Sequence, residues 1–158
     1  MLKTSLSLLL VFFFFEPAFA QTSACVKSKE AVLRSSMEKK GIEVGKATQY
    51  TPFSLTGKTK RNWLEAKDLN GRKVWIRRGD VSYTLSCISV RVNKTRLYKR
   101  PTKKSEKGKL ARRGDSFLDL GGEDGWLQVQ TKAGDIRWIN LDHIWRPTAK
   151  MRMSFERD

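Results

Sequence analysis

The chain has 158 residues and a formal net charge of +16, with 32 lysine and arginine residues against 16 acidic residues. This length allows one ordinary domain or two very small ones, and the charge favours anionic partners without indicating a fold. One histidine and two cysteines are too few for a metal cluster or for an activated nucleophile. We therefore predict no enzyme activity, no catalytic residues, no metal and no cofactor.

The first 20 residues have the pattern of a secretory signal. A short charged start at residues 1–3 precedes an apolar stretch at 6–15, and small residues follow at 18–20. The apolar stretch is too short to span a bilayer, so we predict a signal peptide at 1–20 and no transmembrane span after its cleavage. The predicted location is the periplasm or the extracellular space. The alternative is a lipoprotein lipidated at Cys25, although the usual leucine before that cysteine is missing.

Cys25 and Cys87 are the two cysteines of the chain. Export permits a disulfide between them. Such a bridge would close a loop of about 60 residues, and the chain-entropy model gives it roughly 4 kcal/mol of stabilisation. Two buried free thiols are the alternative.

The first half of the chain has the pattern of short strands separated by turns. We expect strands at residues 25–27 and 45–57 and a pair of strands at 63–76, where Trp63 opens one and Trp75 lies in the other. Residues 31–46 contain several good helix formers. The matching stretch of the second half contains a proline and has the composition of a loop, so we do not expect a helix there.

The second half repeats this order. Alternating residues predict a half-buried strand at 87–92, followed by a long basic loop at 93–113 and a strand at 114–120. A second pair of strands follows at 126–139. Trp63 and Trp126 are 63 residues apart, and Trp75 and Trp138 have the same spacing, as do two turn glycines. This spacing indicates an internal duplication, in which each copy is a small antiparallel barrel.

The residues of this repeat resemble the bacterial SH3-like domain. The sequence Gly125-Trp126-Leu-Gln-Val129 followed by Trp138-Ile139 carries the resemblance in the second copy, and Trp63 with Trp75-Ile76 carries it in the first. The resemblance implies an all-β fold of two tandem small SH3-like β-barrels and an extracytoplasmic binding module without catalysis. Its boundaries would be a signal peptide at 1–20, domains at 21–84 and 85–147, and a C-terminal tail at 148–158. A bridge between the equivalent Cys25 and Cys87 would hold the copies in a roughly two-fold arrangement.

The basic loop of the second copy is the strongest functional signal. Residues 94–113 contain ten basic residues and one acidic residue. Such a segment is either an anion-binding surface or a solvated loop of a basic protein. The candidate contact residues are eight of its cations: Lys94, Arg96, Lys99, Arg100, Lys103, Lys104, Arg112 and Arg113.

Aromatic side chains supply the remaining candidates. Tyr98 lies inside the basic loop and is the aromatic residue that we most expect to contact a ligand. Trp63 and Trp126 are either lining residues of a ligand groove or part of the core. For Trp75 and Trp138 the pattern favours the core.

We predict that the protein is an exported binding or scaffold module of the bacterial cell envelope. It would bind an anionic cell-wall or envelope polymer through the basic loop. The alternative is a protein–protein adaptor or regulator of an envelope enzyme, with an envelope protein as the partner. Export argues against a role with genomic nucleic acid, whatever the charge suggests.

Overall fold

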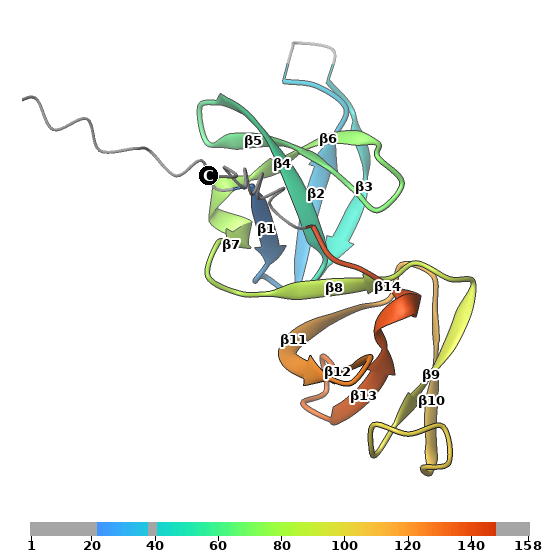
Figure 1. Cartoon of the computed structure of the whole chain (residues 1–158). Coiled ribbons are helices and arrows are strands. Elements are labelled where there is room, and N and C mark those ends of the chain that lie inside the picture. Colours follow the sequence, from blue (N-terminus) through green and yellow to red (C-terminus); the bar gives the residue numbers. More distant parts are fainter. Residues whose placement is uncertain (1–21, 38–40, 148–158) are drawn as a thin grey trace, which may run out of the picture.

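A computed structural model describes residues 22–37 and 41–147 of the chain. The predicted signal peptide at 1–20 and the predicted tail at 148–158 lie outside the described residues. The described part consists of β-strands and two short 3-10 turns, without an α-helix (Figure 1). The all-β class predicted from the sequence is therefore confirmed.

The strands fall into two sets of seven. The first half contains β1 (Ser23–Val26), β2 (Glu30–Arg34), β3 (Glu43–Thr48), β4 (Pro52–Lys60), β5 (Trp63–Lys67), β6 (Lys73–Arg77), the 3-10 turn η1 (Arg78–Asp80) and β7 (Val81–Ser82). The second half contains β8 (Cys87–Val90), β9 (Lys94–Tyr98), β10 (Lys107–Arg112), β11 (Ser116–Glu123), β12 (Trp126–Gln130), β13 (Ile136–Asn140), the 3-10 turn η2 (Leu141–His143) and β14 (Ile144–Trp145).

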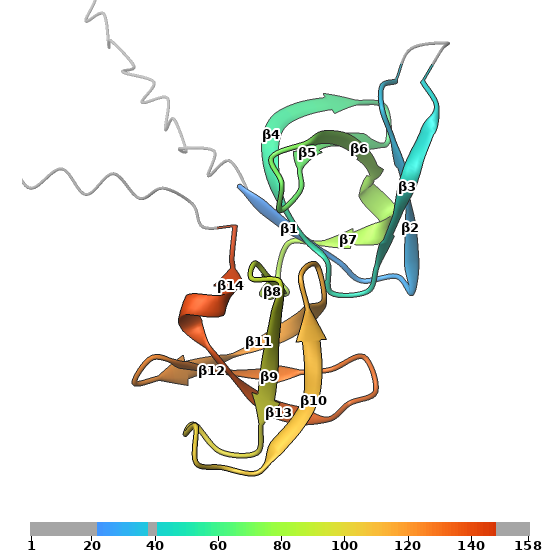
Figure 2. The ribbon, with the colours of Figure 1, turned by 90° about the vertical axis from the view of Figure 1, so that its right-hand side faces the viewer.

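Each set forms one antiparallel sheet, and the two sheets have the same strand order. The first is β3-β2-β6-β5-β4-β1-β7 and the second is β10-β9-β13-β12-β11-β8-β14. Adding seven to each strand of the first sheet gives the second, as an internal repeat requires. Each sheet curls strongly (Figure 2), but no pairing between described strands closes either row into a ring.

The curl of each sheet starts at a bulge in its longest strand. The pairing of β4 with β5 shifts register between Leu55 and Thr59, and Gly57 there has a φ of +85°. The pairing of β11 with β12 shifts between Asp119 and Gly122. A bulge bends its strand and increases the local twist. The first residues of each long strand pair with β1 or β8, and the strand then continues along β5 or β12.

Gly122 is the bulge position at which a side chain has least room. An added Cβ would overlap the carbonyl oxygen of Trp126 and come within 2.9 Å of the Cα of Leu127. We expect Gly122→Ala to lower the free energy of unfolding by about 1–3 kcal/mol, because backbone atoms must move apart. Gly79→Ala is the matched control, since nothing lies within 4 Å of its Cβ position. Urea unfolding of both variants checks this, and equal midpoints would contradict it.

The inward faces of the two sheets enclose separate cores. The largest buried residues of the first core include Val26, Phe53, Leu64, Val74 and Ile76. Those of the second include Ile88, Val90, Leu127, Val129 and Ile139. Alternation along β6 and β13 turns Trp75 and Trp138 to the outer face, where both are half-buried. The expectation that these two tryptophans belong to the core is therefore wrong.

The segment predicted as a long basic loop at 93–113 is a hairpin of β9 and β10. Lys107 pairs with Tyr98 and Arg112 pairs with Lys94, with a register shift between Lys107 and Leu110. Loop structure is confined to the tip between the two strands. The corresponding segment of the first half also forms two strands, β2 and β3, so the rejection of a helix there is confirmed.

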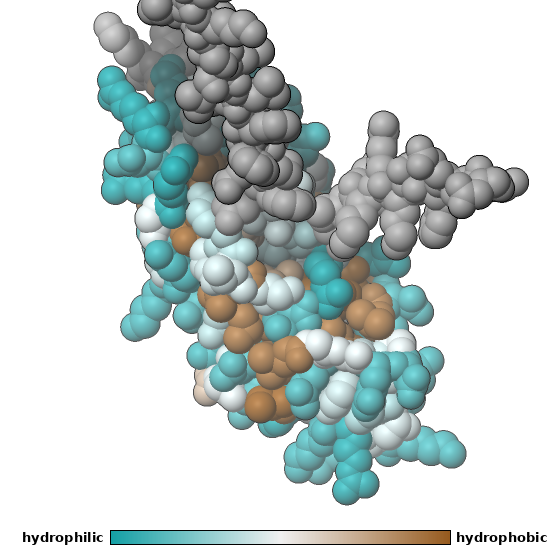
Figure 3. Space-filling view, turned by 60° about the vertical axis from the view of Figure 1, so that its left-hand side comes forward, coloured by the Kyte–Doolittle hydropathy of each residue, from teal (hydrophilic) through white to brown (hydrophobic). Residues whose placement is uncertain are grey.

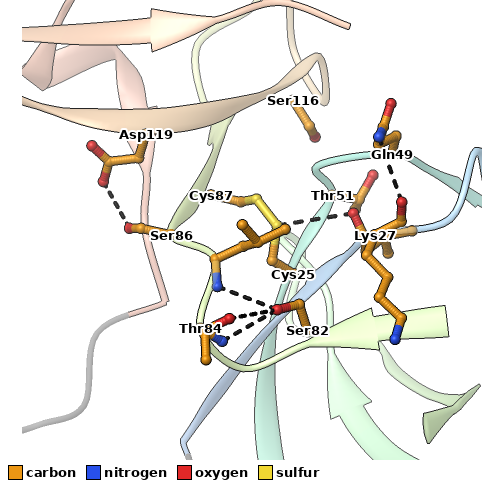
Figure 4. Close-up of a disulfide and its surroundings, with 12 residues drawn as sticks. Cys25, Lys27, Gln49, Thr51, Ser82, Thr84, Ser86, Cys87, Ser116 and Asp119 are labelled. Carbon is orange, nitrogen blue, oxygen red and sulfur yellow. Dashed lines mark hydrogen bonds between the residues drawn. A yellow bond between two sulfur atoms is a disulfide. The ribbon is translucent and has the colours of Figure 1, made fainter. Parts of the chain in front are cut away.

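The predicted bridge between Cys25 and Cys87 is present, with the two Cα atoms 5.8 Å apart (Figure 4). Beside it, Ser86 donates a hydrogen bond to the Asp119 carboxylate at 2.9 Å, and Arg146 forms an ion pair with the same carboxylate at 2.5 Å. The side chain of Asp119 is only 5% exposed. This carboxylate therefore ties β11 to the linker between the halves and to the end of the described chain.

Two further hydrogen bonds join the halves reciprocally. Arg113, after β10, donates to Asn70 in the β5–β6 turn at 2.9 Å. Lys132, in the β12–β13 turn, donates to Thr48 at the end of β3 at 2.6 Å. In each case the end of the third strand of one half contacts the turn between the fifth and sixth strands of the other half. These reciprocal contacts are consistent with the roughly two-fold arrangement expected for a bridge between equivalent cysteines.

Candidate functional site

The β9–β10 hairpin turns one face to the second core and leaves the cations Lys94, Arg96 and Arg112 of its two strands exposed. Thr95, Leu97 and Ala111 point inward and are buried, which anchors the hairpin on the second core. Lys94 and Arg112 are exposed direct partners across the two strands. Like charges in this position repel each other, so the pair favours an anion between them.

The tip of the hairpin is ordered by its own hydrogen bonds. The backbone N–H of Arg100 donates to Ser105 Oγ at 3.0 Å, and that of Lys104 donates to Thr102 Oγ1 at 3.3 Å. Arg100, Lys103 and Lys104 are exposed on this tip. None of these three cations forms an ion pair with a carboxylate of the described residues.

Lys99 is the tip cation that does have a carboxylate partner. Its Nζ lies 2.7 Å from Glu106 Oε2, and this hydrogen bond together with the charge of Lys99 lowers the pKa of Glu106. Glu106 therefore stays ionised at neutral pH and neutralises Lys99. The one acidic residue of the hairpin thus compensates one cation and leaves the others available.

The hairpin surface ends at an aromatic contact. Tyr98 is half-buried and meets Trp126 edge-on, with ring centroids 5.2 Å apart. Tyr98 is also the register partner of Trp138. Trp126 itself is only 9% exposed, whereas Tyr98 and Trp138 are half-buried and remain partly accessible to solvent.

Arg113 has a different place from the other predicted contact residues. Its guanidinium donates to the carbonyl oxygen of Arg91 and to the side-chain oxygen of Asn70. The bond to Asn70 joins the two halves and the bond to Arg91 lies within the second half, so the Arg113 guanidinium is already engaged and lies outside the row of exposed cations on the hairpin. Figure 3 shows that the lower end of the face in this view is mostly hydrophilic, whereas apolar residues gather nearer the middle of that face.

Trp63 has surroundings that the sequence did not reveal. The guanidinium carbons of Arg34 and Arg77 lie 5.6 and 5.3 Å from the centroid of its ring. An open groove of about 820 Å³ beside it is also lined by Arg61 and Arg78. Arg77 and Arg78 adjoin the Trp unit in the sequence, but only the sheet pairing brings Arg34 to the same face.

The described residues contain neither a metal-binding group nor a membrane-spanning helix. No three or more histidine, cysteine, aspartate or glutamate side chains of that part of the chain are placed to hold a metal ion. Within the same residues, no helix is long and apolar enough to cross a membrane. His143 is tied to Thr95, with 2.8 Å between Nδ1 and Oγ1.

These features define an all-β protein of two disulfide-linked sheets with an uncompensated basic hairpin. No protein-family model matches the chain, and no curated protein matches it. Among solved structures, NlpC2 from Trichomonas vaginalis is similar with a TM-score of 0.35 and 11% identity over 78% of this chain and 47% of that one. NlpC1 from the same organism has a TM-score of 0.35 and 12% identity over 78% and 45%. The chain thus spans about half the length of these two proteins.

Proposed function

We propose that this protein is an exported, non-catalytic binding module that holds an anionic cell-wall or envelope polymer on the β9–β10 hairpin. The observation that carries the proposal is the set of exposed cations on this hairpin without a carboxylate partner. Seven side chains form the set, which we call the hairpin cations: Lys94, Arg96, Arg100, Lys103, Lys104, Lys109 and Arg112. A disulfide in the described chain is compatible with export.

The proposal includes an SH3-like architecture for each half. Its support is the order of elements at the end of each sheet, where a 3-10 turn is followed by a short last strand. The strong bend of the longest strands and the pair of Trp-marked strands are further support. In such a module the hairpin formed by the second and third strands, here β9 and β10, is the segment free to contact a ligand.

The proposed mechanism is electrostatic capture followed by local selection of shape. The field of the hairpin cations acts over a Debye length of about 8 Å at physiological salt and concentrates phosphate or carboxylate groups there. Because buried Thr95, Leu97 and Ala111 hold the strands, the charges are presented on a fixed frame. The accessible part of half-buried Tyr98 then offers an apolar contact to a sugar ring where β9 meets the tip of the hairpin.

The test of this function is sedimentation of the oxidised protein with purified cell-wall sacculi across a series of salt concentrations. We expect the bound fraction to fall steeply between about 50 and 200 mM salt, as for other binding that releases counterions. Sacculi stripped of their phosphate polymers serve as the control for the anionic component. Binding that is absent, or that does not change over this salt range, contradicts the proposal. Salt-resistant capture of one envelope protein would instead support the adaptor alternative.

A further inference from the structure

The indole of Trp63 holds two arginine side chains in place. Arg34 comes from β2 and Arg77 from β6, and both guanidinium groups lie within the 6 Å range of a cation–π contact with the ring. Guanidinium groups held against a ring keep their N–H edges in a fixed direction. They therefore lose less conformational entropy when they bind an anion than free arginine side chains would.

Two more arginines complete a cationic groove, which we call the Trp63 groove. Arg61 and Arg78 line it together with Trp63 and Arg77, and Asp80 is its only acidic lining residue among the described positions. Arg34, Arg61, Arg77 and Arg78 are all exposed, and no carboxylate of the described residues pairs with any of them. The volume of about 820 Å³ is within the range of small-molecule sites and exceeds the size of a single ion.

The second half shows that the scaffold does not require these cations. The repeat spacing and the strand pairing place other residue types around Trp126. The equivalents of Arg34, Arg61, Arg77 and Arg78 are Tyr98, Asp124, Asn140 and Leu141. Both halves keep the tryptophan and the strands, so the four arginines are specific to the first half.

Arg61 is present at a backbone position that disfavours it. Its φ is 54°, and the equivalent Asp124 in the second half has a φ of 46°. Aspartate and asparagine tolerate this left-handed region, whereas a long side chain is disfavoured there. An arginine retained at the cost of backbone strain is an observation that points to a functional role for its charge.

We propose that the Trp63 groove is a second anion site, which takes a single phosphorylated or carboxylated sugar unit. Arginine forks pair with phosphate and carboxylate oxygens through two parallel hydrogen bonds. The indole edge and the remaining volume accommodate the ring that carries the anion. This site differs from the hairpin, which binds a polymer through charges distributed along two strands, and it does not rest on the hairpin proposal.

Calorimetric titration of the oxidised protein with glucose 6-phosphate and with glucuronic acid tests the site. Glucose and inorganic phosphate are the reference probes. We expect at least one of the anionic sugars to bind, and to bind at least tenfold more tightly than either reference. Failure of both anionic sugars to bind overturns the proposal. Equal affinity for inorganic phosphate and for the sugar phosphate overturns the assignment of a sugar ring.

Two variants connect the binding to the groove. Arg34→Gln with Arg77→Gln is expected to weaken binding at least tenfold. Arg61→Asn should weaken it several-fold while leaving the unfolding midpoint unchanged or higher, because asparagine accepts the left-handed backbone. Arg100→Gln with Lys103→Gln and Lys104→Gln is the control that should leave sugar binding intact even where polymer binding is lost. Unchanged affinity in the groove variants overturns the proposal.

Discussion

Replacing both Cys25 and Cys87 with alanine is expected to lower the free energy of unfolding by up to about 4 kcal/mol. The bridge spans 62 residues, and closing a loop of that length removes a large part of the entropy of the unfolded chain. The halves have separate cores and are otherwise joined by few side-chain hydrogen bonds. The bridge is therefore the main element that fixes one half against the other.

The measurement is urea unfolding of the double variant and of the wild-type protein with and without reductant. Mass spectrometry after thiol labelling confirms the state of the cysteines in each sample. We expect the reduced wild type to match the variant, because both lack the same constraint. A midpoint that is equal in the oxidised wild type and the double variant would show that the bridge does not stabilise the fold.

The elements predicted best are those that the repeat marks twice. The pairs of strands at Trp63 and Trp126 and their turn glycines recur at one spacing, and the predicted link between Cys25 and Cys87 joins equivalent positions of the two copies. When a pattern occurs in two copies, a local helix or strand propensity in one copy can be checked against the other copy. The helix formers at 31–46 are an example, since pairing of β2 with β3 prevails over their intrinsic preference.

The hairpin was missed because its inward residues are a weak hydrophobic signal. Thr95 and Ala111 are the buried positions beside Leu97, and neither forms the alternation of large apolar residues that predicts a strand. The many cations and the proline at the tip indicate a loop. In the fold, Gly108 is accommodated close to the carbonyl oxygen of Leu97, where a Cβ would come within 2.9 Å. The residue composition of the segment does not show that β9 and β10 approach each other this closely.

The orientation of Trp75 and Trp138 is a second feature that was predicted wrongly from the sequence. The phase of β6 and β13, set by Val74 and Ile139 facing inward, turns Trp75 and Trp138 outward. The prediction that favoured the core for Trp75 and Trp138 therefore chose positions that face outward. The Trp63 groove could not be predicted, because Arg34 reaches it from β2, about 30 residues away in the sequence. Only the pairing of β2 with β6 brings these charges together.

The two cationic surfaces lie in different halves of one disulfide-linked unit. The β9–β10 hairpin extends away from the first half, which contains the Trp63 groove (Figures 1 and 2). A polymer bound along the hairpin and a sugar unit bound in the groove would therefore not compete for the same residues. Substitutions in the hairpin leave the Trp63 groove unchanged, so the contribution of the hairpin cations to polymer binding can be measured separately.

Replacing Arg100, Lys103 and Lys104 with glutamine is expected to produce the largest loss of polymer binding. These cations lie on an ordered tip and lack carboxylate partners, so no internal ion pair is broken. If each contacts one anionic group, the slope of log affinity against log salt should fall by roughly 2 to 3, at about 0.7–0.9 per contact. At low salt the affinity should decrease at least tenfold.

The matched control removes the same charge elsewhere: Lys27→Gln with Lys29→Gln and Lys67→Gln. These three lysines are exposed in the first half and line neither the hairpin nor the Trp63 groove. If net charge alone attracts the polymer, both triple variants lose binding equally, because both lower the net charge by three. If the hairpin is the site, the control keeps most of its affinity and its salt slope, while the hairpin variant loses both. Titration of both variants with sacculi at several salt concentrations distinguishes these outcomes.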